Sequence, residues 1–168
     1  MNRRAIMPKT LHFLLLCSML AVPFLGSSNA HAFTIINRFG QCLQPEFGDT
    51  DDQTPIVGEP CIGAFFQQWK WDGGAIMGIG TGIILPGNQT VSSKCLTAFG
   101  SADGTPVTLV ECQPSLQGLQ KWIRGFPGQI VNVSLSKCLA VENSTAGTQM
   151  TVRACDPNNP NQSWVLRS

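Results

Sequence analysis

The chain has 168 residues, and its 11 Lys and Arg nearly balance its 10 Asp and Glu. Three of the basic residues and both histidines lie before residue 33, so the rest of the chain keeps 11 − 3 = 8 basic residues, a net charge of about 8 − 10 = −2, and no histidine or tyrosine. This composition excludes a basic surface for nucleic acid, and it excludes nucleophilic catalysis that depends on a histidine base.

The first 32 residues have the three parts of a secretory signal peptide. A basic start is followed by an apolar run of 13 residues, Phe13–Leu25, and then by the small-x-small triplet Ala30-His31-Ala32. A helix needs about 20 apolar residues to span a bilayer, which argues against a retained anchor. We expect residues 1–32 to be a signal peptide and residues 33–168 to be a secreted or periplasmic protein without a transmembrane segment.

From Phe33 the apolar pattern is that of short strands. Phe33–Asn37 is rich in β-branched and aromatic residues, and the prolines and glycines between Pro45 and Pro60 exclude a helix there. Ile56-Val57 is predicted as a short strand within this loop. No later stretch has an apolar period of 3.6 that is long enough for a confident helix, so the fold class is all-β.

Three aspartates in the same loop suggest a calcium site, because hard cations bind clustered oxygens. They are Asp49, Asp51 and Asp52. The glycine and the terminal glutamate of a helix-loop-helix calcium site are missing. A solvated turn is the preferred interpretation, and no metal or cofactor is predicted.

One segment interrupts an otherwise regular spacing. Trp69 and Cys95 are 26 residues apart, whereas Trp122 and Cys138 are 16 apart, and the excess falls in the Gly/Ile-rich residues 73–93. Its Gly-x-Gly pairs lack the third glycine and the helix of a dinucleotide site. We expect an extended hairpin or loop, with a surface for docking a partner as the alternative.

The chain contains the same unit three times. The copies run over residues 41–69, 94–122 and 137–164, and each has two cysteines and ends in Gln-x-Trp. After Cys17 is set aside, the cysteines of each copy are 19, 17 and 17 residues apart. Pairing within each copy is the simplest of the fifteen possibilities, and it requires an oxidising compartment. The predicted disulfides are Cys42–Cys61, Cys95–Cys112 and Cys138–Cys155.

This arrangement resembles the ricin B-chain type lectin domain. The resemblance rests on the matched cysteines, on Asp103-Gly104-Thr105-Pro106 and on the three endings QQW, QKW and QSW. It implies a β-trefoil with pseudo-threefold symmetry, with repeats of approximately 33–72, 73–125 and 126–168. It also implies that Trp69, Trp122 and Trp164 belong to the core.

The same resemblance identifies where sugars would bind. The family places a carboxylate two residues after the first cysteine of each repeat, where this chain has Gln44, Thr97 and Ala140. It places an aromatic residue two before the second cysteine, where this chain has Glu59, Val110 and Arg153. Each repeat has therefore lost part of the site.

The third repeat keeps the most. Asn161 and Gln162 complete the Asn-Gln that precedes the tryptophan, Thr151 supplies a polar group, and Glu142 or Asn143 could replace the missing carboxylate. The alternative interpretation is that these residues cap turns.

The function implied is that of a secreted, non-catalytic, carbohydrate-binding module with partly eroded sugar sites and a glycan as its partner. The alternative is a protein-interaction trefoil, such as the binding or delivery subunit of a cytolethal distending-type toxin, with a partner chain. An enzyme is set aside, because only scattered carboxylates could support hydrolysis.

Overall fold

The computed structural model describes residues 32–72, 75–76, 79–86 and 94–168. Most of the predicted signal peptide and much of the Gly/Ile-rich segment lie outside these residues. Among the described residues, no helix has the length and apolar content needed to cross a membrane.

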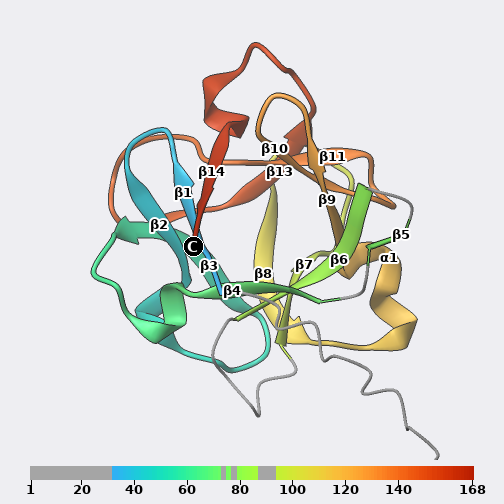
Figure 1. Ribbon diagram of the computed structural model, residues 1–168, viewed down its shortest axis with the longest axis horizontal. Helices are drawn as coiled ribbons and strands as arrows, with labels where there is room; N and C mark the ends of the chain where they lie inside the picture. The colour runs from blue at the N-terminus through green and yellow to red at the C-terminus, as the bar shows by residue number, and fades with distance from the viewer. Residues whose placement is uncertain (1–31, 73–74, 77–78, 87–93) are drawn as a thin grey trace, which may run out of the picture.

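The described residues form one curled antiparallel sheet around a common centre (Figure 1). Its long path runs β14-β1-β2-β3-β8-β13-β11-β10-β9-β6-β4, with β5, β7 and β12 paired to its side. The strands are β1 (Thr34–Asn37), β2 (Gln41–Pro45), β3 (Thr54–Pro60), β4 (Trp69–Asp72), β5 (Ala75–Ile76), β6 (Ile79–Pro86), β7 (Lys94–Ala98), β8 (Thr105–Glu111), β9 (Lys121–Gly125), β10 (Gln129–Asn132), β11 (Lys137–Ala140), β12 (Thr148–Gln149), β13 (Thr151–Ala154) and β14 (Trp164–Arg167).

Helical structure in the described part is confined to single turns. The α-helix α1 has four residues, Gln117–Gln120. Four 3-10 turns occupy Glu46–Gly48, Phe65–Gln67, Pro114–Leu116 and Pro160–Gln162. The all-β β-trefoil predicted from the repeats is therefore confirmed.

Backbone hydrogen bonds close the three repeats into a ring. In each repeat a turn residue with positive φ donates its N–H to a carbonyl of another repeat. The pairs are Gln53 to Leu109 (2.7 Å), Gly104 to Val152 (2.9 Å) and Gly147 to Gly58 (3.0 Å). Because each repeat gives one bond and receives one, no repeat completes its own edge alone.

The Gln-x-Trp endings and the Cys-Leu pairs meet in the core. The three tryptophans are buried in one apolar cluster with the leucines that follow the first cysteines. Each indole Nε1 donates to the carbonyl of the leucine in its own repeat: Trp69 to Leu43 (3.0 Å), Trp122 to Leu96 (2.8 Å) and Trp164 to Leu139 (3.0 Å). Each tryptophan thus fills the core and satisfies a buried carbonyl.

Each repeat also holds one disulfide, as predicted. The bonds join Cys42 to Cys61, Cys95 to Cys112 and Cys138 to Cys155, with Cα separations of 5.0, 5.1 and 5.0 Å. They fix the starts of β2, β7 and β11 against the loops that follow β3, β8 and β13. In the chain-entropy account, a disulfide that closes a loop of this length stabilises the fold by about 3 kcal/mol.

Charged side chains reinforce two of the three junctions between repeats. Asp103 accepts from Lys137 Nζ (2.7 Å) and from the backbone N–H of Ala154 (2.8 Å). Asp52 accepts in the same way from Lys94 and from the N–H of Glu111.

The third junction is built differently. Ala146 stands where the other repeats have the aspartate, Gln41 stands where they have the lysine, and Pro60 has no N–H to donate. There Gln41 Nε2 donates instead to the carbonyl of Ser144 (2.9 Å). The junction between the third and first repeats therefore lacks the ion pair of the other two.

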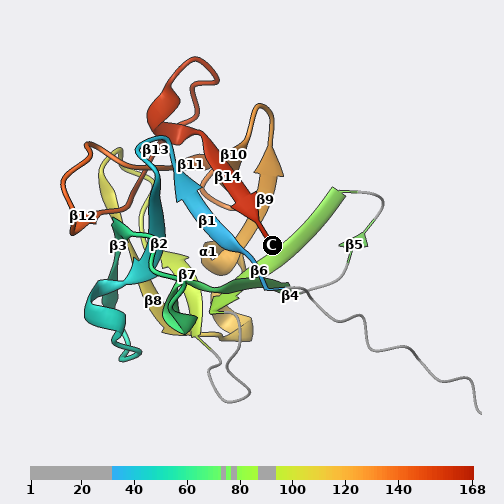
Figure 2. The same ribbon diagram turned by 60° about the vertical axis from the view of Figure 1, so that its left-hand side comes forward.

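Part of the Gly/Ile-rich segment is a regular strand of the trefoil rather than an insertion. Strand β6 pairs with β4 (Trp71 opposite Ile84) and with β9 (Gly82 opposite Trp122), and it also pairs with the short β5. Figure 2 shows β6 running beside β9. β6 has eight residues, whereas its counterparts β1 and β10 in the other two repeats have four each, so part of the extra length lies in this strand.

Candidate functional site

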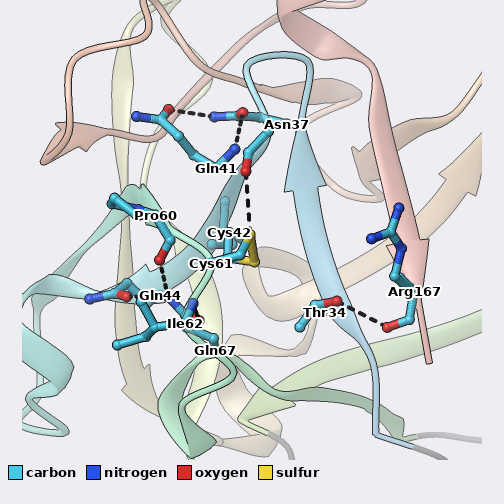
Figure 3. The surroundings of a disulfide bond; sticks show 12 residues. Thr34, Asn37, Gln41, Cys42, Gln44, Pro60, Cys61, Ile62, Gln67 and Arg167 are labelled. Carbon is cyan, nitrogen blue, oxygen red and sulfur yellow. Dashed lines mark hydrogen bonds between the residues drawn. A yellow bond between two sulfur atoms is a disulfide. The ribbon is translucent and has the colours of Figure 1, made fainter.

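The glutamine of each Gln-x-Trp is buried and holds the loop after the second cysteine. Its Nε2 donates to the carbonyl before that cysteine and its Oε1 accepts an N–H just after it. The bonds are Gln67 to Pro60 and from Ile62 (2.8 and 2.9 Å), Gln120 to Glu111 and from Gln113 (2.8 and 3.0 Å), and Gln162 to Ala154 and from Asp156 (2.8 and 2.9 Å). Figure 3 shows Gln67 beside Pro60 and Ile62. Gln162, a predicted sugar contact, is thus engaged inside the framework.

The glutamines differ at the position where the family has its carboxylate. Gln67 Nε2 donates a second bond to Gln44 Oε1 (2.8 Å), and Gln120 Nε2 donates one to Thr97 Oγ1 (3.1 Å). In the third repeat this position is Ala140, which has no acceptor. In the first two repeats the side chain at this position is therefore bonded to the buried glutamine. In the third repeat the small Ala140 makes no such bond and leaves space there.

A cavity of about 190 Å³ lies beside this open position. Its walls are Ala140, Val141, Glu142, Arg153, Asn159 and Asn161. In the register of β11 and β13, Ala140 lies opposite Thr151. Glu142 and Arg153 lie on either side of this pair and line the same cavity.

Glu142 and Arg153 form the charged wall of this cavity. Glu142 Oε1 accepts from Arg153 Nε (2.5 Å) and from Thr151 Oγ1 (3.4 Å). The hydrogen bond that the guanidinium donates to this carboxylate raises the pKa of Arg153 above its usual value. Both groups remain about 40% exposed and keep unused hydrogen-bonding positions, so the wall offers acceptors and donors together.

Asn161 forms the opposite wall. Its backbone N–H is held by Asn159 Oδ1 (3.0 Å) at the start of the 3-10 turn. Within the described part of the chain its side-chain amide makes only long bonds, accepting from Arg38 Nη1 (3.5 Å) and donating to the carbonyl of Glu142 (3.4 Å). A ligand hydroxyl can replace such weak bonds at little cost.

The predicted residues thus divide into two groups. Glu142 and Asn161 line the cavity, and Thr151 is joined to it through Glu142. Asn143 holds the neighbouring turn, where its Oδ1 accepts from Thr145 N (2.8 Å) and Thr148 Oγ1 (2.7 Å), and Gln162 is buried.

Sequence reasoning did not find Arg153 and Asn159 as members of this site. Arg153 occupies the family's aromatic position, and its pairing with Glu142 depends on which strands are neighbours. Among the described residues, no group of three His, Cys, Asp or Glu side chains is placed to hold a metal ion.

Two other cavities have different chemistry. The corresponding position in the first repeat is a groove of about 240 Å³ lined by Gln44, Phe47, Glu59, Pro60, Ile62 and Phe66. A cavity of about 300 Å³ lies between the β9–β10 hairpin and β14, with Arg124 as its charged residue and no carboxylate.

Comparison with known proteins agrees with this geometry. Residues 31–164 match the family model described as the ricin-type beta-trefoil lectin domain. Nigrin b of Sambucus nigra is 28% identical over 102 residues, which are 60% of this chain and 16% of that protein. The chain therefore spans a small part of the length of this curated relative.

Solved structures show the same fold. The agglutinin of Abrus precatorius has a TM-score of 0.65 at 23% identity, covering 82% of this chain and 48% of its own. The designed threefold-symmetric protein ThreeFoil has a TM-score of 0.66 at 21% identity, covering 82% and 98%. A non-toxic homologue of type II RIPs from Momordica charantia, solved with α-methyl-D-galactoside, has a TM-score of 0.64 at 21% identity, covering 82% of this chain and 47% of its own.

Proposed function

Since the chain belongs to the ricin-type β-trefoil lectin family, a family of carbohydrate-binding and generally non-catalytic modules, we propose that it is a secreted glycan-binding protein whose sugar site is the cavity of the third repeat. The observation that supports this site is the meeting of Glu142, Arg153 and Asn161 around one cavity.

The chemistry of these groups suits a sugar. A hydroxyl both donates and accepts, so a site for vicinal hydroxyls needs acceptors and donors within a few ångströms of each other. Glu142 accepts, Arg153 donates, and the amide of Asn161 does both. Ala140 leaves room where the family has a carboxylate, and we propose that Glu142, two residues further along the chain and just after the end of β11, takes over that function.

Erosion of the other two sites follows from the hydrogen bonds of the framework. Gln44 and Thr97 are buried and already bonded to the framework glutamines, so neither is available to a sugar at its usual position. We therefore expect one glycan site of the family type per chain. Affinity would be low, and stronger attachment would need several chains on one surface.

A glycan array with the protein from residue 33 onwards tests this proposal. We expect binding to a limited set of glycans, and we expect Asn161→Ala to abolish or strongly weaken it. Gln162 is a poor choice for the test because its replacement would disturb the buried framework. An array without any bound glycan would refute the proposal and favour the protein-interaction trefoil.

Export of the protein needs a separate test. We propose that residues 1–32 direct secretion and are removed. N-terminal sequencing of the exported protein should begin at Phe33, and a start further upstream would contradict this.

A further inference from the structure

The groove of the first repeat is lined mainly by apolar side chains and contains one carboxylate. Two phenyl rings, Phe47 and Phe66, form its sides together with Ile62, while Glu59 lies half-buried at its edge. Phe66 rests directly over Gly48, where an added Cβ would come within 2.9 Å of the ring atom Cδ1. The bare glycine therefore sets the position of this ring.

Phe47 is exposed in a way that the fold does not explain. Its φ is +54°, in the left-handed region, and its side chain is 93% exposed. A residue with a Cβ is strained in this conformation, and burial of the ring offsets almost none of the strain. The conformation places an aromatic ring at the mouth of the groove at a cost to stability.

Glu59 gives the groove its charge. Within the described residues its carboxylate has neither an ion pair nor a hydrogen bond, whereas Glu142 of the third repeat is paired with Arg153. The stretch of chain that supplies the groove is also acidic, because residues 39–69 contain five acids (Glu46, Asp49, Asp51, Asp52, Glu59) and no Lys or Arg. Among these acids, Asp52 is neutralised by Lys94.

We propose that this groove binds a quaternary ammonium group, the trimethylammonium of a choline-type ligand. A cation is favoured both by the carboxylate and by the faces of the phenyl rings. The methyl groups would contact Phe47, Phe66 and Ile62. This site does not depend on the sugar site of the third repeat.

The groove suits a methylated ammonium better than a primary one. A lysine or free amine carries three N–H donors that need acceptors, but Gln44 Oε1 is already bonded to Gln67. Glu59 is then the main free acceptor among the lining side chains. A trimethylammonium has no hydrogen-bond donors and presents only methyl groups, so it can pack against the apolar walls without leaving a donor unpaired.

A sugar fits this groove less well for a related reason. The side chains that line it provide one amide N–H group, Gln44 Nε2, which donates a long bond to the carbonyl of Pro45 (3.4 Å). Hydroxyls would find an acceptor in Glu59 and few donors. The chemistry of the two repeats therefore separates a cation groove from a polar sugar cavity.

Titration with choline and with its neutral isostere 3,3-dimethyl-1-butanol tests the proposal, with binding followed by NMR shifts or calorimetry. The two ligands have the same shape and differ by the charge. We expect choline to bind and the isostere to bind at least about fivefold more weakly, in line with an exposed cation–π and ion-pair contribution. Equal binding of the two ligands, or no binding of choline at millimolar concentration, overturns the proposal.

Two variants locate the site. Glu59→Gln should weaken choline binding about threefold to fivefold, whereas Glu46→Gln, the same charge change outside the groove lining, should leave it nearly unchanged. Equal losses in both variants would mean a general effect of charge and would contradict the groove.

Phe47→Gly gives a readout that a structural residue would not give. It should raise stability, because glycine tolerates the positive φ, and it should weaken choline binding about threefold. Phe99→Ala, which removes another exposed phenyl ring outside the groove, should leave binding unchanged. If Phe47→Gly and Glu59→Gln abolish glycan binding while choline has no effect, the groove is a second sugar site and the proposal is wrong.

Competition then identifies the source of the group. Phosphatidylcholine vesicles and a peptide with a trimethyllysine both present trimethylammonium, in a lipid surface and in a protein tail respectively. The natural class of ligand is the one that displaces choline from the wild type and binds Glu59→Gln more weakly. Failure of both, with choline still bound, assigns the groove to a free small molecule.

Discussion

Replacing Gln53 with glycine should stabilise the trefoil. Gln53, Gly104 and Gly147 are equivalent turn residues with φ of 68°, 89° and 81°, and each donates its N–H across a junction between repeats. The side chain of Gln53 is exposed and makes no hydrogen bond within the described residues. The substitution therefore removes the left-handed penalty without removing a contact.

The expected gain is small but measurable. A residue with a Cβ in this region costs about 1–2 kcal/mol, and the greater freedom of glycine in the unfolded chain returns about 0.5–1 kcal/mol of this. We expect a net stabilisation of about 0.5–1 kcal/mol, which for a domain of this size raises Tm by roughly 2–4 °C. Urea unfolding followed by tryptophan fluorescence would measure it.

Two controls isolate the cause. Gln53→Ala removes the side chain but keeps the Cβ, so it should give none of this gain. Gly104→Gln creates at the second junction the strain that Gln53 has at the first, and it should destabilise by about 1 kcal/mol. Equal stability of wild type and Gln53→Gly, together with a neutral Gly104→Gln, would refute the reasoning.

Other predictions concern the junctions and the core. Lys137 and the N–H of Ala154 lower the pKa of Asp103, so the folded state is favoured when this carboxylate is charged. This stabilisation should be complete at neutral pH and should disappear as the pH falls through the lowered pKa; Asp103→Asn should flatten the acid side of a Tm–pH profile, and an unchanged profile would contradict the pairing. Trp164→Ala should cost about 3–5 kcal/mol in urea unfolding, and an unmoved midpoint would mean that this indole is not part of the core.

Most of the fold could be predicted because the chain repeats itself. Two cysteines and a Gln-x-Trp at nearly constant spacing in three copies leave few ways to close a core, and the β-trefoil with one disulfide per repeat is what the structure shows. The Gly/Ile-rich segment was harder to interpret. Its glycine-rich composition does not predict a strand. In the structure it contains the regular strand β6, which pairs with β4 and β9.

The candidate sites were less predictable because they depend on contacts across strands. Arg153 meets Glu142 through the register of β11 and β13, and no local pattern links residues 11 positions apart in this way. Gln162 has the sequence of a sugar contact but uses its amide inside the framework. Phe47 belongs to no motif. Its exposure follows from a positive φ, and the sequence Glu-Phe-Gly does not predict that φ.

Calorimetric titration of one array-selected glycan tests most directly whether the third repeat holds the sugar through Glu142 and Asn161. Glu142→Ala should weaken binding about tenfold or more, because it removes a charged hydrogen-bond acceptor. It should hardly change Tm, because the ion pair with Arg153 is exposed. Phe47→Gly, in the first repeat, should bind the glycan like the wild type. Unchanged affinity in Glu142→Ala and Asn161→Ala, with a loss in Phe47→Gly, would contradict the account.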